Sequence, residues 1–300
     1  MAKLIMMVGP SYSGKSTISE ELALKEDAMI VSSDRIREEW YGNEAIQGNN
    51  QKIFQEVHNR IKKFLKLDVS VIYDATNLSA KRRMAFLKDL VHSNIDCIKE
   101  CHVVVADLDT INNRMKSRLR KVPYDVVKRQ LMNFQCPHEY EGWDMIVLHN
   151  TGAKCDPESL LRQCEGVAHD NHHHTLDIAE HMKAAFEKYC EVHYVLDTIL
   201  MFAIRYHDVG KYYTKIFQKS NGDPSEEAHY FGHQNFGAYI LLCSGCCMKD
   251  SQVLRLAAIV TYHMEHYLRD DEQMRAFYDM IGEELSADLK TVAFCDKMAH

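Results

Sequence analysis

The sequence predicts two domains: an α/β domain in which helices cover both faces of a parallel sheet, followed by an all-α domain. In the first 150 residues, short apolar segments rich in β-branched side chains alternate with longer stretches of helical period. From about Asp156 onward only helical patterns follow. A chain of 300 residues with 46% apolar and 26% charged side chains is long enough for two globular domains. We expect the first domain over residues 1–152 and the second over residues 165–300.

The individual elements follow from the same patterns. We expect the strands of the sheet at residues 4–8, 28–31, 69–73, 102–105 and 145–148, with intervening helices that include residues 46–67 and 80–92. In the second domain we expect helices at residues 180–189, 194–206, 236–243, 253–262, 272–281 and 287–299. The longest apolar runs are far too short to cross a membrane.

Composition narrows the classes of function. The formal net charge of −7 argues against a protein coated by nucleic acid, although a local basic cluster leaves nucleic acid open as a ligand. The ten cysteines are scattered and no signal peptide is visible, so we expect reduced thiols and a cytoplasmic location. Cys243, Cys246 and Cys247 lack a second pair at zinc-binding spacing. We expect them to be buried small side chains, with a zinc site as the alternative.

A glycine-rich loop follows the first expected strand. Residues 9–17 read Gly-Pro-Ser-Tyr-Ser-Gly-Lys-Ser-Thr, which is the G-x-x-x-x-G-K-[ST] phosphate loop between a buried strand and a helix. Gly9 and Gly14 let successive N–H groups face an anion, and the helix that begins near Lys15 adds its positive dipole end. We expect Lys15 to reach the terminal phosphates of ATP and Ser16 to bind Mg²⁺. An ordinary glycine turn is the alternative. The loop residues expected at the nucleotide are Gly9, Ser13, Gly14, Lys15, Ser16 and Thr17.

Carboxylates follow the second and third expected strands, where ligands of parallel sheets bind. Asp34 is placed to take a proton from an attacking hydroxyl, and Arg37 is placed to hold a phosphate of the acceptor. The alternative is an aspartate at a helix N-terminus with a solvated arginine. Asp74 is placed to act near Mg²⁺, or else to cap the helix that begins near Ser79.

Two arginines precede Val122 and Pro123. Arg114 and Arg118 are four residues apart, so we expect them on one face of a helix. Two guanidinium groups there could clamp the triphosphate and stabilise charge during phosphoryl transfer. A solvated basic face, with Arg120 and Lys121, is the alternative.

The second half carries an adjacent His207–Asp208 pair after the apolar stretch 195–204, which we interpret as a buried helix. Such a pair offers one nitrogen and one carboxylate to a divalent metal. Lys211, one turn beyond Asp208, could bind a substrate phosphate. Isolated histidines such as His229 or His266 are better explained as ordinary surface or core residues. Distant candidates for the remaining ligands are His181, His233, His263 and Asp296.

Taken in order, the motifs of the first half resemble the kinase domain of phage polynucleotide 5′-kinase. Those kinases carry a phosphate loop, an Asp-x-x-Arg, an Asp-(x)-Thr-Asn-Leu with paired arginines, and a lid with two arginines before Val-Pro. The resemblance covers about residues 3–150 and implies ATP and Mg²⁺ as cofactors. It further implies that Asp34 is the general base and that Arg37 holds the phosphate 3′ to the acceptor hydroxyl. The corresponding residues are Gly9–Thr17, Asp34 with Arg37, Asp74–Leu78 with Arg82 and Arg83, and Arg114 with Arg118; Ala75 is an extra residue in the third motif.

The second half, over about residues 168–300, resembles the HD superfamily of metal-dependent phosphohydrolases. The resemblance implies that one divalent metal such as Mn²⁺ is bound by His181, His207, Asp208 and Asp296. His233 and His263 match positions that hold a second metal in dinuclear members, where Asp208 would bridge the two ions. The histidines at residues 172–174 add to the resemblance, although His172 and His173 could simply start a helix.

The two resemblances together predict an enzyme that heals broken ends of RNA or DNA. The first site would phosphorylate a 5′-hydroxyl from ATP, and the second would remove a 3′-phosphate or a 2′,3′-cyclic phosphate. A ligase would be a separate partner, because no Lys-x-Asp-Gly nucleotidyltransferase motif is present. Two alternatives remain: a nucleoside or small-molecule kinase fused to an HD nucleotide phosphohydrolase, and a nucleotide-sensing module with little turnover.

Overall fold

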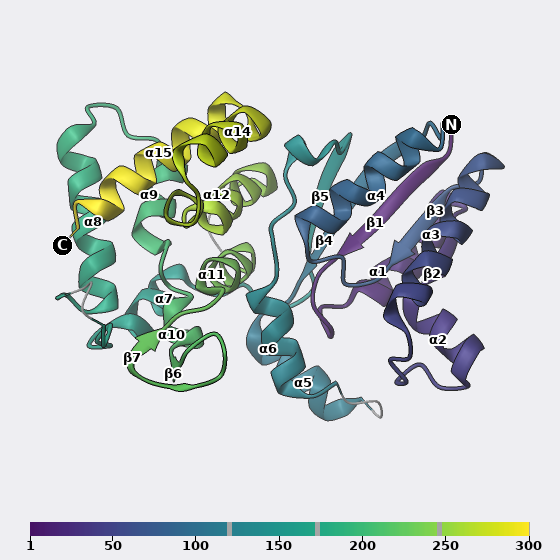
Figure 1. Ribbon diagram of the computed structural model, residues 1–300, viewed down its shortest axis with the longest axis horizontal. Coiled ribbons are helices and arrows are strands. Elements are labelled where there is room, and N and C mark those ends of the chain that lie inside the picture. Colours follow the sequence, from purple (N-terminus) through teal and green to yellow (C-terminus); the bar gives the residue numbers. More distant parts are fainter. Residues whose placement is uncertain (119–121, 172–174, 245–247, 300) are drawn as a thin grey trace. The chain divides into compact units, whose positions relative to one another are not determined.

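The chain forms two compact units. The computed structural model describes residues 1–118, 122–171, 175–244 and 248–299 (Figure 1). One unit consists of Met1–Gln130 and Pro137–Ala153, and the other of Leu131–Cys136 and Lys154–His300. Residues 153–164, which separate the two expected domains, are not only a linker, because they contain helix α7 (Pro157–Cys164) of the second unit.

The first unit is built on a five-stranded, wholly parallel sheet, which confirms the α/β prediction. The strand order is β2-β3-β1-β4-β5. Strand β4 begins four residues earlier than expected, because Ile98, Lys99 and Glu100 pair with β1 although two of them are polar. The bounds are β1 (Lys3–Val8), β2 (Met29–Ser32), β3 (Val71–Asp74), β4 (Ile98–Val105) and β5 (Met145–Asn150).

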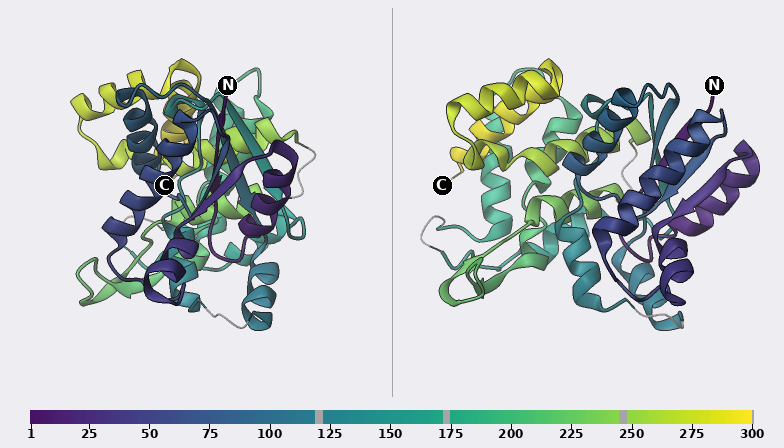
Figure 2. Two further views of the ribbon diagram at one scale, coloured as in Figure 1. Left: turned by 90° about the vertical axis from the view of Figure 1, so that its right-hand side faces the viewer. Right: turned by 45° about the vertical axis from the view of Figure 1, so that its right-hand side comes forward.

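Helices cover both faces of this sheet (Figure 2). Ile18 and Leu22 of α1 pack on the face that contains Ile72. Tyr73, the next residue of β3, points to the other face, where its ring contacts His58 of α3 and Phe86 of α4. The helical bounds are α1 (Lys15–Glu26), α2 (Ser33–Tyr41), α3 (Asn50–Lys66), α4 (Ala80–His92), α5 (Leu108–Ser117), α6 (Tyr124–Met132) and the short 3₁₀ helix η1 (Glu139–Glu141).

A buried ion pair ties the loop after β3 to η1. Arg83 of α4 and Glu141 are both almost fully buried, and their two hydrogen bonds measure 2.7 and 2.6 Å. The same guanidinium donates to the carbonyls of Asn77 and Leu78, at 2.9 and 3.0 Å. Trp143 donates a third hydrogen bond to Glu141. Arg83 thus bridges Glu141 and the two loop carbonyls, so its side chain holds the β3–α4 loop in place.

The second unit is mainly helical. Helices α8, α9, α12 and α15 pack on one another, and α11 packs on α12. Eight of the ten residues of α11 are buried, so this helix forms the centre of the unit. The bounds are α8 (Ile178–Val192), α9 (Thr198–Tyr206), α10 (Lys211–Thr214), α11 (His233–Leu242), α12 (Asp250–Tyr262), α13 (Glu265–Leu268), α14 (Asp271–Ile281) and α15 (Glu283–Lys297). Among the described helices, none combines the length and apolar character that crossing a membrane requires.

The expectation that this part contains no strand is wrong for one hairpin. Strand β6 (Ile216–Gln218) pairs antiparallel with β7 (Pro224–His229). Most of these residues are exposed and do not alternate in polarity, so the pattern of a strand is missing. The Asn221-Gly222 dipeptide between them, with Gly222 at φ 91°, is the turn signal that could have predicted the hairpin.

The helix expected at residues 194–206 begins later, at Thr198. The Asp197 carboxylate accepts hydrogen bonds from the N–H groups of Ile199 and Leu200 and so caps the helix there. Val195, expected in a buried helix, is 88% exposed. Cys243 is buried as expected, whereas Cys246, Cys247 and the histidines at 172–174 lie outside the described residues.

We predict that Arg83→Ala lowers the free energy of unfolding of the first unit by about 3–5 kcal/mol, because it leaves the Glu141 carboxylate buried and unpaired. The neighbouring Arg82 is exposed, so Arg82→Ala should change stability by no more than about 0.5 kcal/mol. Urea denaturation of both variants measures the difference. Equal midpoints would contradict the structural role of Arg83.

Candidate active sites

The phosphate loop connects β1 to α1 and requires glycine at two positions. A Cβ atom on Gly9 would lie 2.3 Å from the carbonyl oxygen of Val104, which no side chain could tolerate. Gly14 has φ 96°, a conformation that favours glycine, and it precedes the first residue of α1. The loop is held to the β3–α4 loop by the Gly9 N–H, which donates to the carbonyl of Thr76 at 3.0 Å.

Polar groups inside this loop lack the partners that an anion would supply. The ammonium group of Lys15 is buried and donates to the carbonyl of Pro10 at 2.7 Å. Burial lowers the pKa of Lys15 to about 8, and the Asp74 and Asp34 carboxylates only partly offset that effect. The buried hydroxyl of Ser13 has no hydrogen-bond partner among the described residues. The loop therefore fits the phosphates of ATP.

Asp74 lies at the end of β3, beside the loop. Its carboxylate accepts a hydrogen bond of 3.3 Å from the Ser16 hydroxyl. Burial raises the pKa of Asp74, and the charge of Lys15 acts in the opposite direction. A serine hydroxyl next to a carboxylate is a donor set of the kind that Mg²⁺ prefers.

Asp34 and Arg37 lie in the first turns of α2, directly after β2. The Asp34 carboxylate is half-exposed and contacts the Arg37 guanidinium at 2.8 Å. Arg37 is buried and donates to the Asn50 side chain at 2.9 Å, and its Nε–H has no hydrogen-bond partner within the described part of the chain. The alternative of a solvated arginine does not describe this side chain. No feature of the sequence indicates that Asn50, thirteen residues away, holds Arg37.

Arg114 and Arg118 both reach Tyr12 of the phosphate loop, but the prediction that they share a helix face is wrong. Helix α5 ends at Ser117, and Arg118 continues in extended conformation. Arg114 donates to the carbonyl of Tyr12 at 2.9 Å and to Thr151, whereas the Arg118 guanidinium lies 5.8 Å from the centre of the Tyr12 ring. Arg120 and Lys121 lie outside the described residues. Thr151, which follows β5 and also donates to the carbonyl of Ser13, was missed from the sequence.

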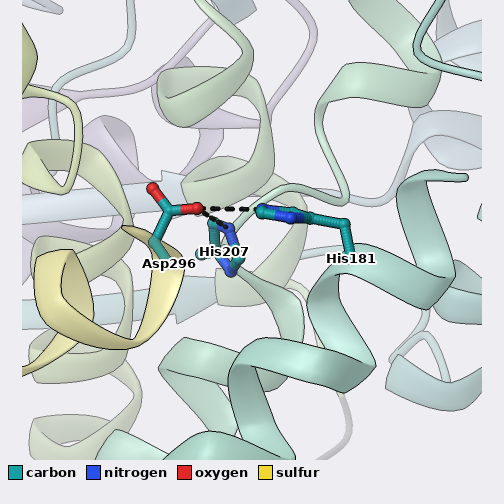
Figure 3. Close-up of side chains that lie close together, drawn as sticks. All are labelled: His181, His207 and Asp296. Atoms are coloured by element: carbon teal, nitrogen blue, oxygen red, sulfur yellow. Dashed lines mark hydrogen bonds and ion pairs between the residues drawn. The ribbon is translucent and has the colours of Figure 1, made fainter. Parts of the chain in front are cut away.

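In the second unit, the structure brings all six expected metal-ligating side chains together. Two groups of three have their candidate ligand atoms within 4.8 Å of one another. In the first group, the Asp296 carboxylate lies 2.9 Å from His181 Nε2 and 3.5 Å from His207 Nε2 (Figure 3). All six side chains are buried. Three of them lie in α8, α11 and α15, and the other three lie just beyond the ends of α9 and α12. The two groups are His181, His207 and Asp296, and Asp208, His233 and His263.

The Asp208 carboxylate lies between the two groups. Its Oδ2 atom is 3.3 Å from His207 Nε2 and 3.7 Å from His181 Nε2. Its Oδ1 atom is 3.2 Å from His233 Nε2 and 3.7 Å from His263 Nε2. Each oxygen therefore faces a different pair of imidazoles, which is the arrangement of a carboxylate that bridges two ions.

The imidazoles are oriented for metal binding by the backbone. In His207, His233 and His263, Nδ1 donates to the carbonyl three residues earlier, in each case at 2.8 Å. This orients each ring so that Nε2 points into the site. These three Nε2 atoms and Asp208 Oδ1 are buried without a hydrogen-bond partner among the described residues. Buried groups are rarely left so, and divalent ions such as Mn²⁺ fit this donor set.

The charged groups of this site shift one another's pKa values. Burial opposes ionisation of both His207 and Asp208. The neighbouring carboxylates nevertheless raise the pKa of His207 to about 10. Lys211 and His207 hold the pKa of Asp208 well below its usual range, while burial lowers that of His263.

Lys211 is buried and bound within the site. Its ammonium group lies 2.6 Å from Asp208 Oδ2 and 3.3 Å from His169 Nε2. Burial, together with Lys211, lowers the pKa of His169 to about 4, so this imidazole is neutral and accepts the hydrogen bond. His169 was not predicted, and neither was Tyr267, whose hydroxyl donates to Asp296 at 2.9 Å. Nothing in the local sequence of either residue marks it as part of the site.

Comparison with known proteins identifies the class of the first unit. Residues 4–137 match a protein-family model described as AAA domain. Together with the phosphate loop, this makes the first unit a P-loop domain of the kinase type, with ATP and Mg²⁺ as its cofactors.

Among curated proteins, the chain is similar to an A-adding tRNA nucleotidyltransferase of Deinococcus radiodurans, with 30% identity over 46% of this chain and 31% of that protein. It is also similar to an L-seryl-tRNA(Sec) kinase of Methanococcus maripaludis, with 27% identity over 53% of this chain and 64% of that protein. The chain thus spans less than two thirds of the length of either relative.

Similar solved structures include a chain of a Pnkp1/Rnl/Hen1 complex, with 26% identity, a TM-score of 0.33, and coverage of 41% of this chain and 41% of that chain. A putative kinase from Chloroflexus aurantiacus is similar at 16% identity, with a TM-score of 0.42, over 50% of this chain and 85% of that chain.

We predict that Mn²⁺ at about one hundred times its dissociation constant stabilises the wild-type second unit by about 2.7 kcal/mol, which corresponds to a rise of about 5–10 °C in melting temperature. The His207→Ala/Asp208→Ala variant should lose this rise together with its bound metal, because it lacks ligands in both groups. Differential scanning fluorimetry with metal analysis measures both quantities.

The matched control is His266→Ala/Asp279→Ala, which removes an exposed histidine and an exposed aspartate of the same unit. It should respond to Mn²⁺ as the wild type does. A His207→Ala/Asp208→Ala variant that kept its metal would rule out the proposed centre.

Proposed function

We propose that the chain is a bifunctional end-healing enzyme, an ATP-dependent 5′-hydroxyl kinase joined to an HD-type, metal-dependent phosphohydrolase acting on 3′-phosphate or 2′,3′-cyclic phosphate ends. The observation that carries the proposal is the coexistence of two built sites in one chain. One is the phosphate loop with Asp34 and Arg37 on its acceptor side. The other is the buried centre around Asp208.

In the kinase, the residues divide between donor and acceptor. ATP with Mg²⁺ supplies the phosphoryl group and neutralises part of its charge. Lys15 exchanges its contact with the Pro10 carbonyl for a phosphate oxygen, and Arg114 and Arg118 add positive charge at the loop. Asp34 accepts the proton of the attacking 5′-hydroxyl, which is general base catalysis. Arg37, held by Asn50, presents its free Nε–H to the acceptor phosphate.

In the hydrolase, the six ligating side chains would hold one or two divalent ions, with Asp208 between them. Bound metal of this kind supplies an activated hydroxide and charge stabilisation at a phosphate. Lys211 neutralises Asp208 and lies close enough to meet an incoming phosphate. Tyr267 and His169 orient Asp296 and Lys211 through their hydrogen bonds. The assignment of this activity is supported by the geometry of the site and by the resemblance alone.

The pairing of activities explains why one chain would carry both sites. Breaks that leave a 5′-hydroxyl and a cyclic phosphate need both ends altered before ligation. A separate RNA ligase is therefore the expected partner, and nucleic-acid ends of RNA or DNA are the expected substrate.

The central experiment incubates an RNA carrying a 5′-hydroxyl and a 2′,3′-cyclic phosphate with ATP, Mg²⁺ and Mn²⁺, and analyses both ends. Conversion of both ends supports the proposal. Transfer to free nucleosides but not to the RNA would instead support a small-molecule kinase fused to a nucleotide phosphohydrolase. ATP binding without transfer to any acceptor would indicate a nucleotide-sensing module.

We predict that Asp34→Ala lowers kcat for 5′-phosphorylation by about 10²–10⁴-fold, because the base that accepts the hydroxyl proton is lost. ATP affinity should stay nearly unchanged. Asp34→Asn, which retains an oxygen for Arg37, should be equally inactive and separates proton transfer from positioning. Loss of ATP binding in a folded variant would place Asp34 among the nucleotide or metal ligands instead.

We predict that Arg37→Ala raises KM for the oligonucleotide acceptor far more than KM for ATP. A guanidinium can donate two charge-assisted hydrogen bonds to one phosphate. Steady-state kinetics with each substrate varied in turn gives the two constants. An increase confined to the KM for ATP would remove Arg37 from the acceptor site.

A further inference from the structure

A groove in the first unit lies outside both candidate sites. One hollow of about 590 Å³ is bordered by the edge strand β2 and by α2 and α3. A second, of about 320 Å³, is lined by α3 and by Ser93. The two share Asn59 and Lys63 and so adjoin along α3, and we refer to the pair as the groove.

The groove begins at the candidate acceptor site. Ser32, two residues before Asp34, and Arg35, the residue after it, line its first hollow. The Ser32 hydroxyl accepts a hydrogen bond from the Asp34 N–H at 3.3 Å. Arg35 is also close enough to lower the pKa of Asp74 at the phosphate loop. A chain whose end reaches Asp34 could therefore continue directly into the groove.

The groove is basic although the whole chain is acidic. Five basic and two acidic side chains line it, whereas the whole chain carries −7; Lys62 is paired with Asp89 beside the groove at 2.9 Å. Glu39 and Glu56 both pair with Arg60. Arg35, Lys63 and Lys66 are exposed and have no ion pair within the described part of the chain. The basic side chains are Arg35, Arg60, Lys62, Lys63 and Lys66.

The floor of the first hollow is apolar. Met29, which is 48% exposed, lies there with Ile30 and Phe64. The exposed Asn59 lies between this floor and the second hollow and offers an amide donor and acceptor. Apolar and aromatic surface beside a basic track suits unpaired bases and their phosphates, because bases stack while lysines contact the backbone. A small anion would need no such length of groove.

We infer that this groove binds the single-stranded polynucleotide that follows the 5′-hydroxyl nucleotide, with its phosphates along Arg35, Lys63 and Lys66 and its first base over Met29 and Phe64. The inference rests on the proposed kinase function and adds to it. It makes the preferred acceptor a polynucleotide several nucleotides long rather than a nucleotide or a nucleoside.

The test measures KM for acceptors that range from a nucleoside 3′-monophosphate to single strands of about 4, 8 and 12 nucleotides. In the wild type, KM should fall as the acceptor becomes longer. Lys63→Gln/Lys66→Gln should lose most of this gain but phosphorylate the 3′-monophosphate as the wild type does, which also shows that the variant is folded. For the longest strand, the slope of log KM against log salt should decrease by about 1.4, the value for two lost phosphate contacts.

The matched control is Lys25→Gln/Lys88→Gln, which removes two exposed lysines of the same unit that line neither hollow. It should keep both the length dependence and the salt slope. Transfer with a KM independent of length in the wild type, or full length dependence in Lys63→Gln/Lys66→Gln, overturns the groove while leaving the kinase intact. No transfer to any 5′-hydroxyl acceptor overturns the proposed kinase itself.

Discussion

Burial of the Asp208 carboxylate is the constraint on which the helical unit depends. An isolated buried charge costs far more free energy than such a unit could recover, so cations and hydrogen-bond donors must surround it. Lys211 meets Oδ2 at 2.6 Å, whereas Oδ1 faces His233 Nε2 at 3.2 Å, where a bound metal would supply the positive charge. Because Lys211 lies in α10 and His233 in α11, the positions of these two helices are tied to one side chain.

In the first unit the corresponding constraint is the alignment of parallel strand ends. Ser32 and Asp74 are register partners at the ends of β2 and β3, and β1 ends beside β3 at the phosphate loop. Parallel pairing therefore places the candidate base, the carboxylate near Mg²⁺ and the phosphate loop at one edge of the sheet. Arg83 then fixes the β3–α4 loop by donating hydrogen bonds to the carbonyls of Asn77 and Leu78.

Regular elements could be predicted where local pattern decides them. Residues 80–92 were expected to be helical and are helix α4, and all five parallel strands lie where apolar runs were found. The hairpin β6–β7 could not be found by periodicity, because its residues are exposed and alternate weakly. The prediction that Arg114 and Arg118 share a helix is wrong because the chain leaves helical conformation at Arg118. Residue spacing alone does not reveal this change.

For the candidate sites, the sequence supplied the identities of the reactive side chains but not the interactions that orient them. The carbonyl bonds to the histidine Nδ1 atoms depend on where each helix ends. The partners of Arg37 and Lys211 depend on contacts between residues far apart in the chain, namely Asn50 and His169. Such long-range contacts leave no periodic trace in a single sequence.

The second unit is built from two separate stretches of the chain, so no single cut separates the two units. Leu131–Cys136 belongs to the second unit although residues on both sides belong to the first. Phe134 and Cys136 are fully buried there, the former against the ring of Tyr239 and the latter with its N–H directed to Thr261. In a recombinant fragment that ends at residue 153, the Phe134 ring would be exposed to water. The fragment that begins at residue 154 would lack this ring from its core. Recombination between genes at the obvious linker would therefore damage both halves, so the two units are expected to be inherited as one piece.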